Sequence, residues 1–148
     1  MRLIAHRGNI HGPNVEDENK PQYILNSISH GYDCEIDVRY IDDVLYLGHD
    51  EPSYRIELSF LIENCNKLWI HCKNIEVLDY LIQYKCLNVF WHQEDNYTLT
   101  SHNYIWCYPK QSSTKRSIIL MPEYDNFNID KYAFGVCSDY VSRINENV

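Results

Sequence analysis

The sequence has few positive charges for its length and no long apolar run. Its 13 Lys and Arg stand against 21 Asp and Glu, which gives a net charge of −8 over 148 residues. Phosphate backbones and anionic bilayers are bound mainly by surplus Lys and Arg, so this balance argues against a general nucleic-acid or membrane-surface binder. A small anionic substrate remains compatible if cations gather at one site. No stretch approaches the roughly 18 uninterrupted apolar residues of a membrane span.

A targeting segment and paired cysteine motifs are also missing. The apolar run at the N-terminus, Leu3-Ile4-Ala5, ends at His6 and is far too short for the core of a signal peptide. The six cysteines contain no CxxC pair of the kind that binds zinc or cycles between redox states. An even number permits a disulfide framework, but without a signal sequence we expect reduced, mostly buried cysteines. These features predict a cytoplasmic protein.

Linkers, low-complexity tracts and internal repeats are absent as well. Hydrophobic residues make up 45% of the chain and charged residues 23%, close to the averages for folded proteins. Such a length suits one core, so we expect a single domain over residues 1–148.

Short β-type segments rich in Ile, Val, Tyr and Trp recur along the chain and are separated in places by helical patterns. Helices are predicted over Pro21–His30, Leu58–Cys65 and Ile75–Ile82, with Asn19 near the first N-terminus and Asn74 as the N-cap of the third. The eight predicted strands are Leu3–His6, Cys34–Tyr40, Val44–His49, Lys67–Lys73, Asn88–His92, Tyr104–Tyr108, Ser117–Met121 and Gly135–Val141.

Alternation of strand and helix indicates parallel pairing, and eight such strands suggest a (β/α)₈ barrel of the TIM type. A full barrel usually needs roughly 200 residues or more. From Asn88 onward the predicted strands leave room only for loops or single helical turns. The sequence therefore predicts a trimmed α/β barrel with several helices shortened or missing in the second half. An open α/β sheet of fewer strands is the alternative.

Polar side chains cluster where these apolar strands end, which is where a parallel barrel builds its active site. Glu35 and Asp37 lie two apart on one strand and so project from one face. The other candidates are His6 and Arg7 after the first strand, His49 after the third, and His71 with Lys73 on the fourth.

Each of these residue types has a role in phosphodiester cleavage. Paired carboxylates suit a hard divalent cation, which would polarise phosphoryl oxygens. Arg and Lys would bind the remaining phosphate oxygens. Two histidines with pKa values near neutrality can divide the roles of general base and general acid.

The ordered motifs His6-Arg7-Gly8, Glu18-Asn19, Glu35-x-Asp37 and His49-Asp50 resemble those of the glycerophosphodiester phosphodiesterase family. This family belongs to the wider group of phosphatidylinositol-specific phospholipase C-like barrels. The tail Gly135–Val141, with Asp139-Tyr140, is similar to the closing strand of the family.

The resemblance implies His6 and His49 as the acid–base pair, Glu35 and Asp37 as metal ligands, and Arg7 as a phosphate contact. Lys73 matches the lysine that family members carry on the fourth strand, where it would also bind substrate. At the position of the third acidic ligand this chain has His71, a ligand that favours Mn²⁺ or a later transition metal over Mg²⁺ or Ca²⁺.

The leading functional hypothesis is a metal-dependent hydrolase of a small glycerophosphodiester-like molecule. Two alternatives stay open: a non-catalytic module that binds metal and phosphate, and a lyase that forms a cyclic phosphate. Missing outer helices would expose apolar strand backs such as Phe90 and Ile105, which indicates a homodimer.

Overall fold

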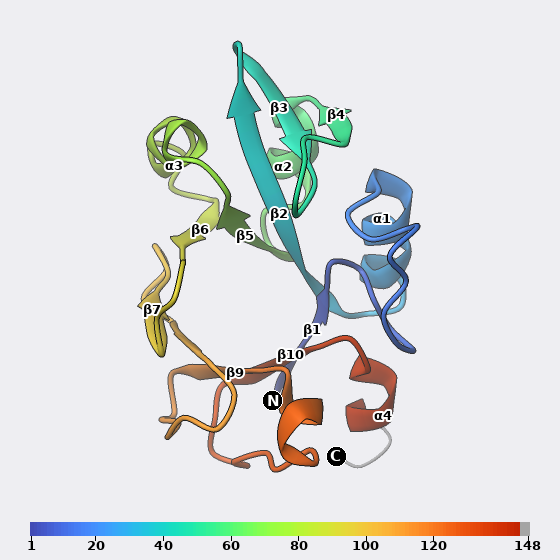
Figure 1. Ribbon diagram of the computed structural model, residues 1–148, viewed down its shortest axis with the longest axis vertical. Helices are drawn as coiled ribbons and strands as arrows, with labels where there is room; N and C mark the ends of the chain where they lie inside the picture. Colours follow the sequence, from blue (N-terminus) through green and yellow to red (C-terminus); the bar gives the residue numbers. More distant parts are fainter. Residues whose placement is uncertain (146–148) are drawn as a thin grey trace.

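Seven parallel strands form the centre of the computed structural model, which describes residues 1–145 (Figure 1). Neighbouring strands are joined by main-chain hydrogen bonds, and the sheet curls so that its two ends approach each other. Their order across the sheet is β6 (Asn88–Trp91), β5 (Leu68–Cys72), β2 (Asp33–Ile41), β1 (Arg2–His6), β10 (Gly135–Ser138), β9 (Ser117–Leu120) and β8 (Ile105–Cys107).

Three antiparallel strands extend this array. β3 (Val44–Leu47) pairs with β2, β4 (Tyr54–Ile56) pairs with β3, and β7 (Tyr97–Leu99) pairs with β8. Between β6 and β7 the described residues form no strand ladder. A side-chain hydrogen bond connects the two strands: the Thr98 hydroxyl donates to the Trp91 carbonyl at 2.7 Å. The result is one mixed, curled sheet.

The predicted trimmed (β/α)₈ barrel is therefore wrong. All eight predicted segments contain strands, but Val44–Leu47 returns antiparallel to β2 rather than joining the parallel array. Only two residues, Asp42 and Asp43, connect β2 to β3, and both have left-handed φ values, 48° and 61°. Two residues of this conformation form a hairpin turn and cannot form a crossover. The sheet is mixed and has ten strands, so the alternative of an open sheet with fewer strands does not describe it either.

The three predicted helices are present, and two short helical elements that the sequence did not predict follow them. They are α1 (Pro21–Ser29), α2 (Leu58–Glu63) and α3 (Ile75–Ile82), followed late in the chain by the 3₁₀ turn η1 (Pro122–Asp125) and by α4 (Val141–Asn145). Asn74 is the N-cap of α3, as predicted, and accepts a hydrogen bond from the Val77 amide. Asn19 does not cap α1, because Lys20 is the N-cap residue there.

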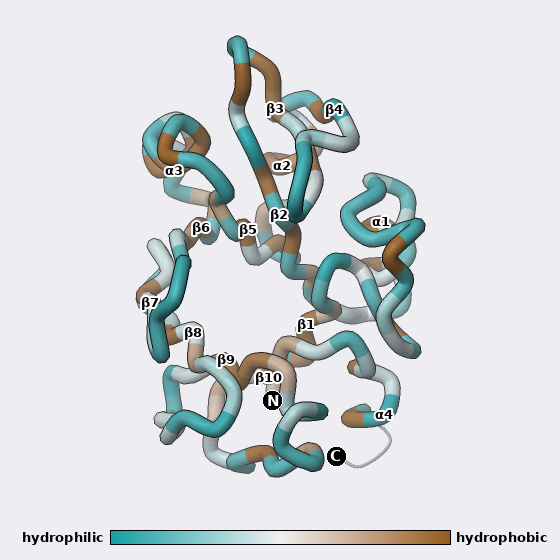
Figure 2. Tube along the Cα trace, viewed as in Figure 1, coloured by the Kyte–Doolittle hydropathy of each residue, from teal (hydrophilic) through white to brown (hydrophobic). Residues whose placement is uncertain are grey.

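Apolar side chains pack on both faces of the sheet. On the outer face, Ile24 of α1, Leu61 of α2 and Leu81 of α3 pack against strand residues. A second apolar cluster lies inside the curled sheet. Figure 2 shows hydrophobic residues along β9 and β10. This inner cluster consists of Ile4, Trp69, Phe90, Trp106, Ile118, Leu120, Met121 and Cys137.

Phe90 belongs to that inner cluster and is 2% exposed, so the prediction that it lies on a bare outer face is wrong. Its parity along β6 places it inside the curl, where Trp106 covers it with ring centroids 4.7 Å apart. All six cysteines are free thiols, and Cys34, Cys72, Cys107 and Cys137 are buried. Within residues 1–145, no helix is long and apolar enough to cross a membrane.

Candidate functional site

The site lies one layer above the inner apolar cluster, at the carboxyl ends of β1, β2 and β5. Side chains alternate between the two faces along a strand, so residues two positions beyond the inner cluster also point into the curl. His6 follows Ile4 in this way, and His71 follows Trp69. The strand register pairs His6 with Glu35, and Asp37 with His71. Four of the predicted site residues are thus neighbours on one inner face.

Glu35, Asp37 and His71 form a compact group of potential metal ligands. One ligand atom from each lies within 4.8 Å of the others. The His71 Nδ1 atom is 3.2 Å from Asp37 Oδ1 and 3.8 Å from Glu35 Oε1. Asp37 Oδ1 is buried and has no hydrogen-bond partner within the described residues. Two carboxylates and an imidazole around an unsatisfied oxygen fit a divalent cation, so this group could hold a metal ion.

The two carboxylates are buried side by side, and their pKa values move apart. Burial raises the pKa of Glu35, and the neighbouring charge of Asp37 adds to this effect. Burial acts in the same direction on Asp37, but the imidazole of His71 and the positive charge of Arg7 outweigh it. The pKa of Asp37 is therefore held well below its ordinary value of 3.8. Asp37 is the residue that keeps an anionic oxygen at this site.

His6 connects this group to the last strand. Its Nδ1 atom lies 2.8 Å from Asp139 Oδ1, and its Nε2 atom lies 3.8 Å from Glu35 Oε2. Burial lowers the pKa of His6, but the hydrogen bond to Asp139 and the charge of Glu35 raise it above 6.5 overall. An imidazole with a raised pKa and one nitrogen facing the acidic group is suited to proton transfer.

Arg7 is fixed in a strained conformation beside the carboxylates. Its φ of 52° is left-handed, and its amide donates to the Glu35 carbonyl at 2.9 Å. The guanidinium contacts Asp37 Oδ2 and Glu18 Oε2, each at 3.2 Å. Asn19, instead of capping the helix, donates from its side chain to Asp37 Oδ2 at 2.9 Å and accepts from the Asp37 amide. Glu18 and Asn19 thus orient Arg7 and Asp37.

Lys73, directly after β5, and His49, on the loop after β3, complete the predicted set. The Lys73 Nζ atom lies 3.9 Å from Asp37 Oδ1. His49 lies on the loop after β3, half-exposed, with its Nδ1 atom 2.7 Å from Asp50 Oδ1. Partial burial and the charges of Arg7 and Lys73 lower the pKa of His49, although Asp37 acts in the opposite direction. His49 is therefore part of the same electrostatic environment.

A pocket of about 470 Å³ lies between the α1 side of the site and the loop after β3. Arg7 and His49 both line it, together with Glu18, Asn19 and Tyr54. A pocket of this size admits a small molecule, and two predicted site residues are on its wall.

Three further residues lie at the site although the sequence did not predict them as site residues. Asp139 contacts His6 and follows β10, so the rule of polar residues at strand ends would have found it. His92 and Tyr108 follow β6 and β8, and their rings pack at an angle of 31° with centroids 4.0 Å apart. The His92 ring lies 5.8 Å from that of His71, which extends the site toward the second half of the sheet.

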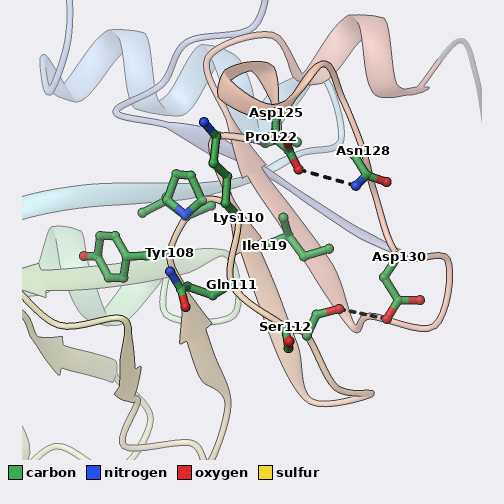
Figure 3. Close-up of a pocket in the computed structure, with 12 residues that line it drawn as sticks. Tyr108, Lys110, Gln111, Ser112, Ile119, Pro122, Asp125, Asn128 and Asp130 are labelled. Atoms are coloured by element: carbon green, nitrogen blue, oxygen red, sulfur yellow. Dashed lines mark hydrogen bonds between the residues drawn. The ribbon is translucent and has the colours of Figure 1, made fainter.

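Another pocket, of about 430 Å³, lies against Ile119 of β9, with Tyr108 on its wall (Figure 3). Two loops enclose it, and hydrogen bonds between Ser113 and Asp130 and between Asn128 and Asp125 hold its walls. None of the predicted site residues lines it.

Comparison with known proteins adds no assignment: no family model, no curated protein and no solved structure matches this chain.

Proposed function

We propose that this protein is a metal-dependent phosphodiester hydrolase that acts on a small glycerophosphodiester-like molecule. The observation that carries the proposal is the convergence of three potential metal ligands, an oriented imidazole and two cations at one strand-end layer. The resemblance of the ordered motifs from His6 to Asp50 to those of glycerophosphodiester phosphodiesterases supports the same reaction.

Glu35, Asp37 and His71 would hold the divalent cation. When bound, it would act as a Lewis acid that offsets negative charge on the phosphoryl oxygens. With an imidazole in the ligand set, Mn²⁺ or a later transition metal is favoured over Ca²⁺. Asp37, whose pKa is held low, would supply an anionic ligand oxygen.

Arg7 and Lys73 would bind the phosphate beside that group. Both lie against Asp37, so their charges are fixed at the place where a phosphodiester would bind. Arg7 is further fixed by Glu18, whose other oxygen accepts a hydrogen bond from Asn9. A guanidinium held in this way presents its planar donors without the entropy cost of ordering a free side chain.

His6 and His49 would transfer the protons. Asp139 holds Nδ1 of His6, which leaves Nε2 toward the acidic group. His49 approaches from the loop after β3, on the wall of the 470 Å³ pocket. The two imidazoles come from different elements, and in-line displacement would require one as the base and the other as the acid on opposite sides of phosphorus. The pocket would hold the alcohol portion of the substrate.

Hydrolysis of bis(p-nitrophenyl) phosphate by chelator-treated protein, with and without added Mn²⁺, tests the proposal. Metal-dependent turnover that is lost in His6→Ala supports it. Phosphorus NMR of the products from a glycerophosphodiester separates a hydrolase from a lyase, since only the lyase releases a cyclic phosphate as its end product. Metal binding without turnover of either substrate would favour the non-catalytic module.

A further inference from the structure

The Arg39 side chain holds the main chain of the loop that carries His49. Its Nε atom donates to the Gly48 carbonyl at 3.3 Å, and its Nη2 atom donates to the carbonyls of His49 at 2.5 Å and Asp50 at 3.1 Å. One guanidinium therefore binds three consecutive carbonyl groups. Such a contact set needs the planar array of donors that Arg has and Lys lacks.

The loop is also closed on itself, so these contacts act on a defined conformation. The Gly48 amide donates to the Asp37 carbonyl at 3.0 Å, and the Ser53 amide donates to the Leu47 carbonyl at 2.9 Å. Gly48 has a φ of 148°, and a Cβ atom there would collide with the Glu51 carbonyl oxygen. The main chain is therefore restrained on both sides of His49.

The His49 ring itself has few other restraints. Within residues 1–145 the ring has a single hydrogen-bond partner, Asp50, whose side chain is 91% exposed. A surface pair of this kind contributes little to order. The position of the His49 ring relative to Arg7 and Asp37 must therefore come from the main chain, where Arg39 acts.

We propose that Arg39 is a positioning residue that holds His49 against the phosphate site. The inference rests on the proposed function, because it assigns Arg39 a role through the acid–base residue His49. Asp37 and Arg39 lie two apart on β2 and share a face. The same strand that supplies two metal ligands thus also fixes the loop that supplies a proton-transfer group. Misplacement by about 1 Å can cost on the order of 10²-fold in rate.

The test compares Arg39→Gln and Arg39→Lys with Arg55→Gln. Arg55 lies on β4 of the same hairpin region, is exposed and pairs only weakly with Glu57 at 3.6 Å, so it is a matched control. With bis(p-nitrophenyl) phosphate and Mn²⁺, we expect both Arg39 variants to lose at least about tenfold in kcat with KM within about twofold. Arg55→Gln should match the unaltered protein. Unchanged kcat in Arg39→Gln overturns the proposal.

A double-mutant cycle separates positioning from general stability. If Arg39 acts through His49, adding Arg39→Gln to His49→Ala should produce no further loss of kcat. If Arg39 merely stabilises the sheet, Arg39→Gln should reduce kcat by the same factor in the unaltered protein and in His49→Ala. That result overturns the proposal.

Amide hydrogen exchange at Gly48 and Ser53, whose amides donate to the Asp37 and Leu47 carbonyls, supplies a readout that needs no turnover. We expect exchange at least about tenfold faster in Arg39→Gln, with β1 and β10 unchanged. Unchanged exchange in the loop overturns the positioning role whatever the activity. Absence of turnover in the unaltered protein contradicts the proposed function and the catalytic meaning of Arg39, while the exchange result still decides whether Arg39 holds the loop.

Discussion

His6 and Asp139 are 133 positions apart in the chain, and their side chains form a 2.8 Å hydrogen bond. The contact exists because β10 is the parallel neighbour of β1, with Ala5 opposite Ser138. Asp139 Oδ1 also accepts from the Asn9 side-chain amide at 2.8 Å. With the Nδ1 proton donated to Asp139, the tautomer of His6 leaves Nε2 free to accept a proton on the side of Glu35.

Asp139→Asn should reduce turnover by about 10²-fold, because an amide does not enforce this tautomer and does not stabilise the imidazolium. The pKa of His6 should fall, since the hydrogen bond to Asp139 contributes to raising it. The pH profile of kcat/KM with an aryl phosphodiester measures both effects. Asp79→Asn, on the exposed face of α3, is the matched control and should leave both unchanged. An unchanged profile in Asp139→Asn would contradict the assigned role of this contact.

The same pair predicts how stability depends on pH. The folded-state pKa of Asp139 is lowered from 3.8. The contribution of Asp139 to folding stability is therefore fully present above pH 3.8 and is lost as pH falls through the folded-state pKa. The folded-state pKa of His6 is raised from 6.5. The contribution of His6 to folding stability is therefore fully present below pH 6.5 and is lost as pH rises through the folded-state pKa. Both contributions coexist between about pH 4 and 6.5.

The difference in melting temperature between the unaltered protein and Asp139→Asn should therefore be largest near pH 5 to 6 and should narrow as pH rises above about 6.5. Thermal unfolding followed by circular dichroism across this range measures it. A difference that stays constant from pH 5 to 8 would show that the charge on His6 contributes nothing to the pair.

His6→Ala and His49→Ala should each lose at least about 10²-fold in turnover while retaining the fold, which is the usual scale of a general acid–base contribution. His30→Ala is the control, since His30 is exposed at the end of α1. Circular dichroism must accompany the assay so that loss of folding is not read as loss of chemistry. Retained activity in both site variants would contradict the assignment.

Local rules were sufficient for eight of the ten strands, for α1 to α3 and for the Asn74 cap, because each depends on residues near in sequence; they missed the three-residue strands β4 and β7. The rule of polar residues at strand ends also identified His6, Glu35, Asp37 and His71, which the structure brings together. The exposed N-terminal end of α3 shows the limit of such patterns. Ile75 fits the predicted apolar stripe yet is 62% exposed, and Val77 is buried instead.

The predicted topology is wrong because of one turn. The Asp42-Asp43 link was treated as a connection between parallel strands, although two residues can only reverse the chain. Asp139 and Arg39 were missed for a different reason. The position of Asp139 after β10 marks it as a candidate, but its contact with His6 depends on the pairing of β1 with β10, and the contacts of Arg39 with loop carbonyls have no local sequence signature.

Neutralising one buried carboxylate should stabilise the metal-free protein. Glu35 and Asp37 are both almost fully buried, and two adjacent anions there carry an unfavourable desolvation and repulsion energy. In chelator-treated Glu35→Gln we expect the melting temperature to rise by about 2–4 °C for each kcal/mol gained in the free energy of unfolding. The stabilisation by Mn²⁺ should be smaller than in the unaltered protein. Thermal unfolding with and without Mn²⁺ measures both. Equal stabilisation by Mn²⁺ in the two proteins would exclude Glu35 as a ligand.

His71 determines which metal the site should prefer. Its Nδ1 atom faces Asp37 and Glu35, and Mn²⁺, Co²⁺ and Zn²⁺ accept imidazole nitrogen more readily than Ca²⁺ or Mg²⁺ do. We expect the unaltered protein to rank Mn²⁺ above Ca²⁺, and His71→Glu to shift the preference toward Mg²⁺ or Ca²⁺ because it restores an oxygen ligand and a negative charge. Calorimetric titration of chelator-treated protein with each metal measures the ranking without requiring turnover. If both forms rank the metals identically, His71 does not bind the ion, and its place beside Lys73 is then better explained by contact with the substrate phosphate.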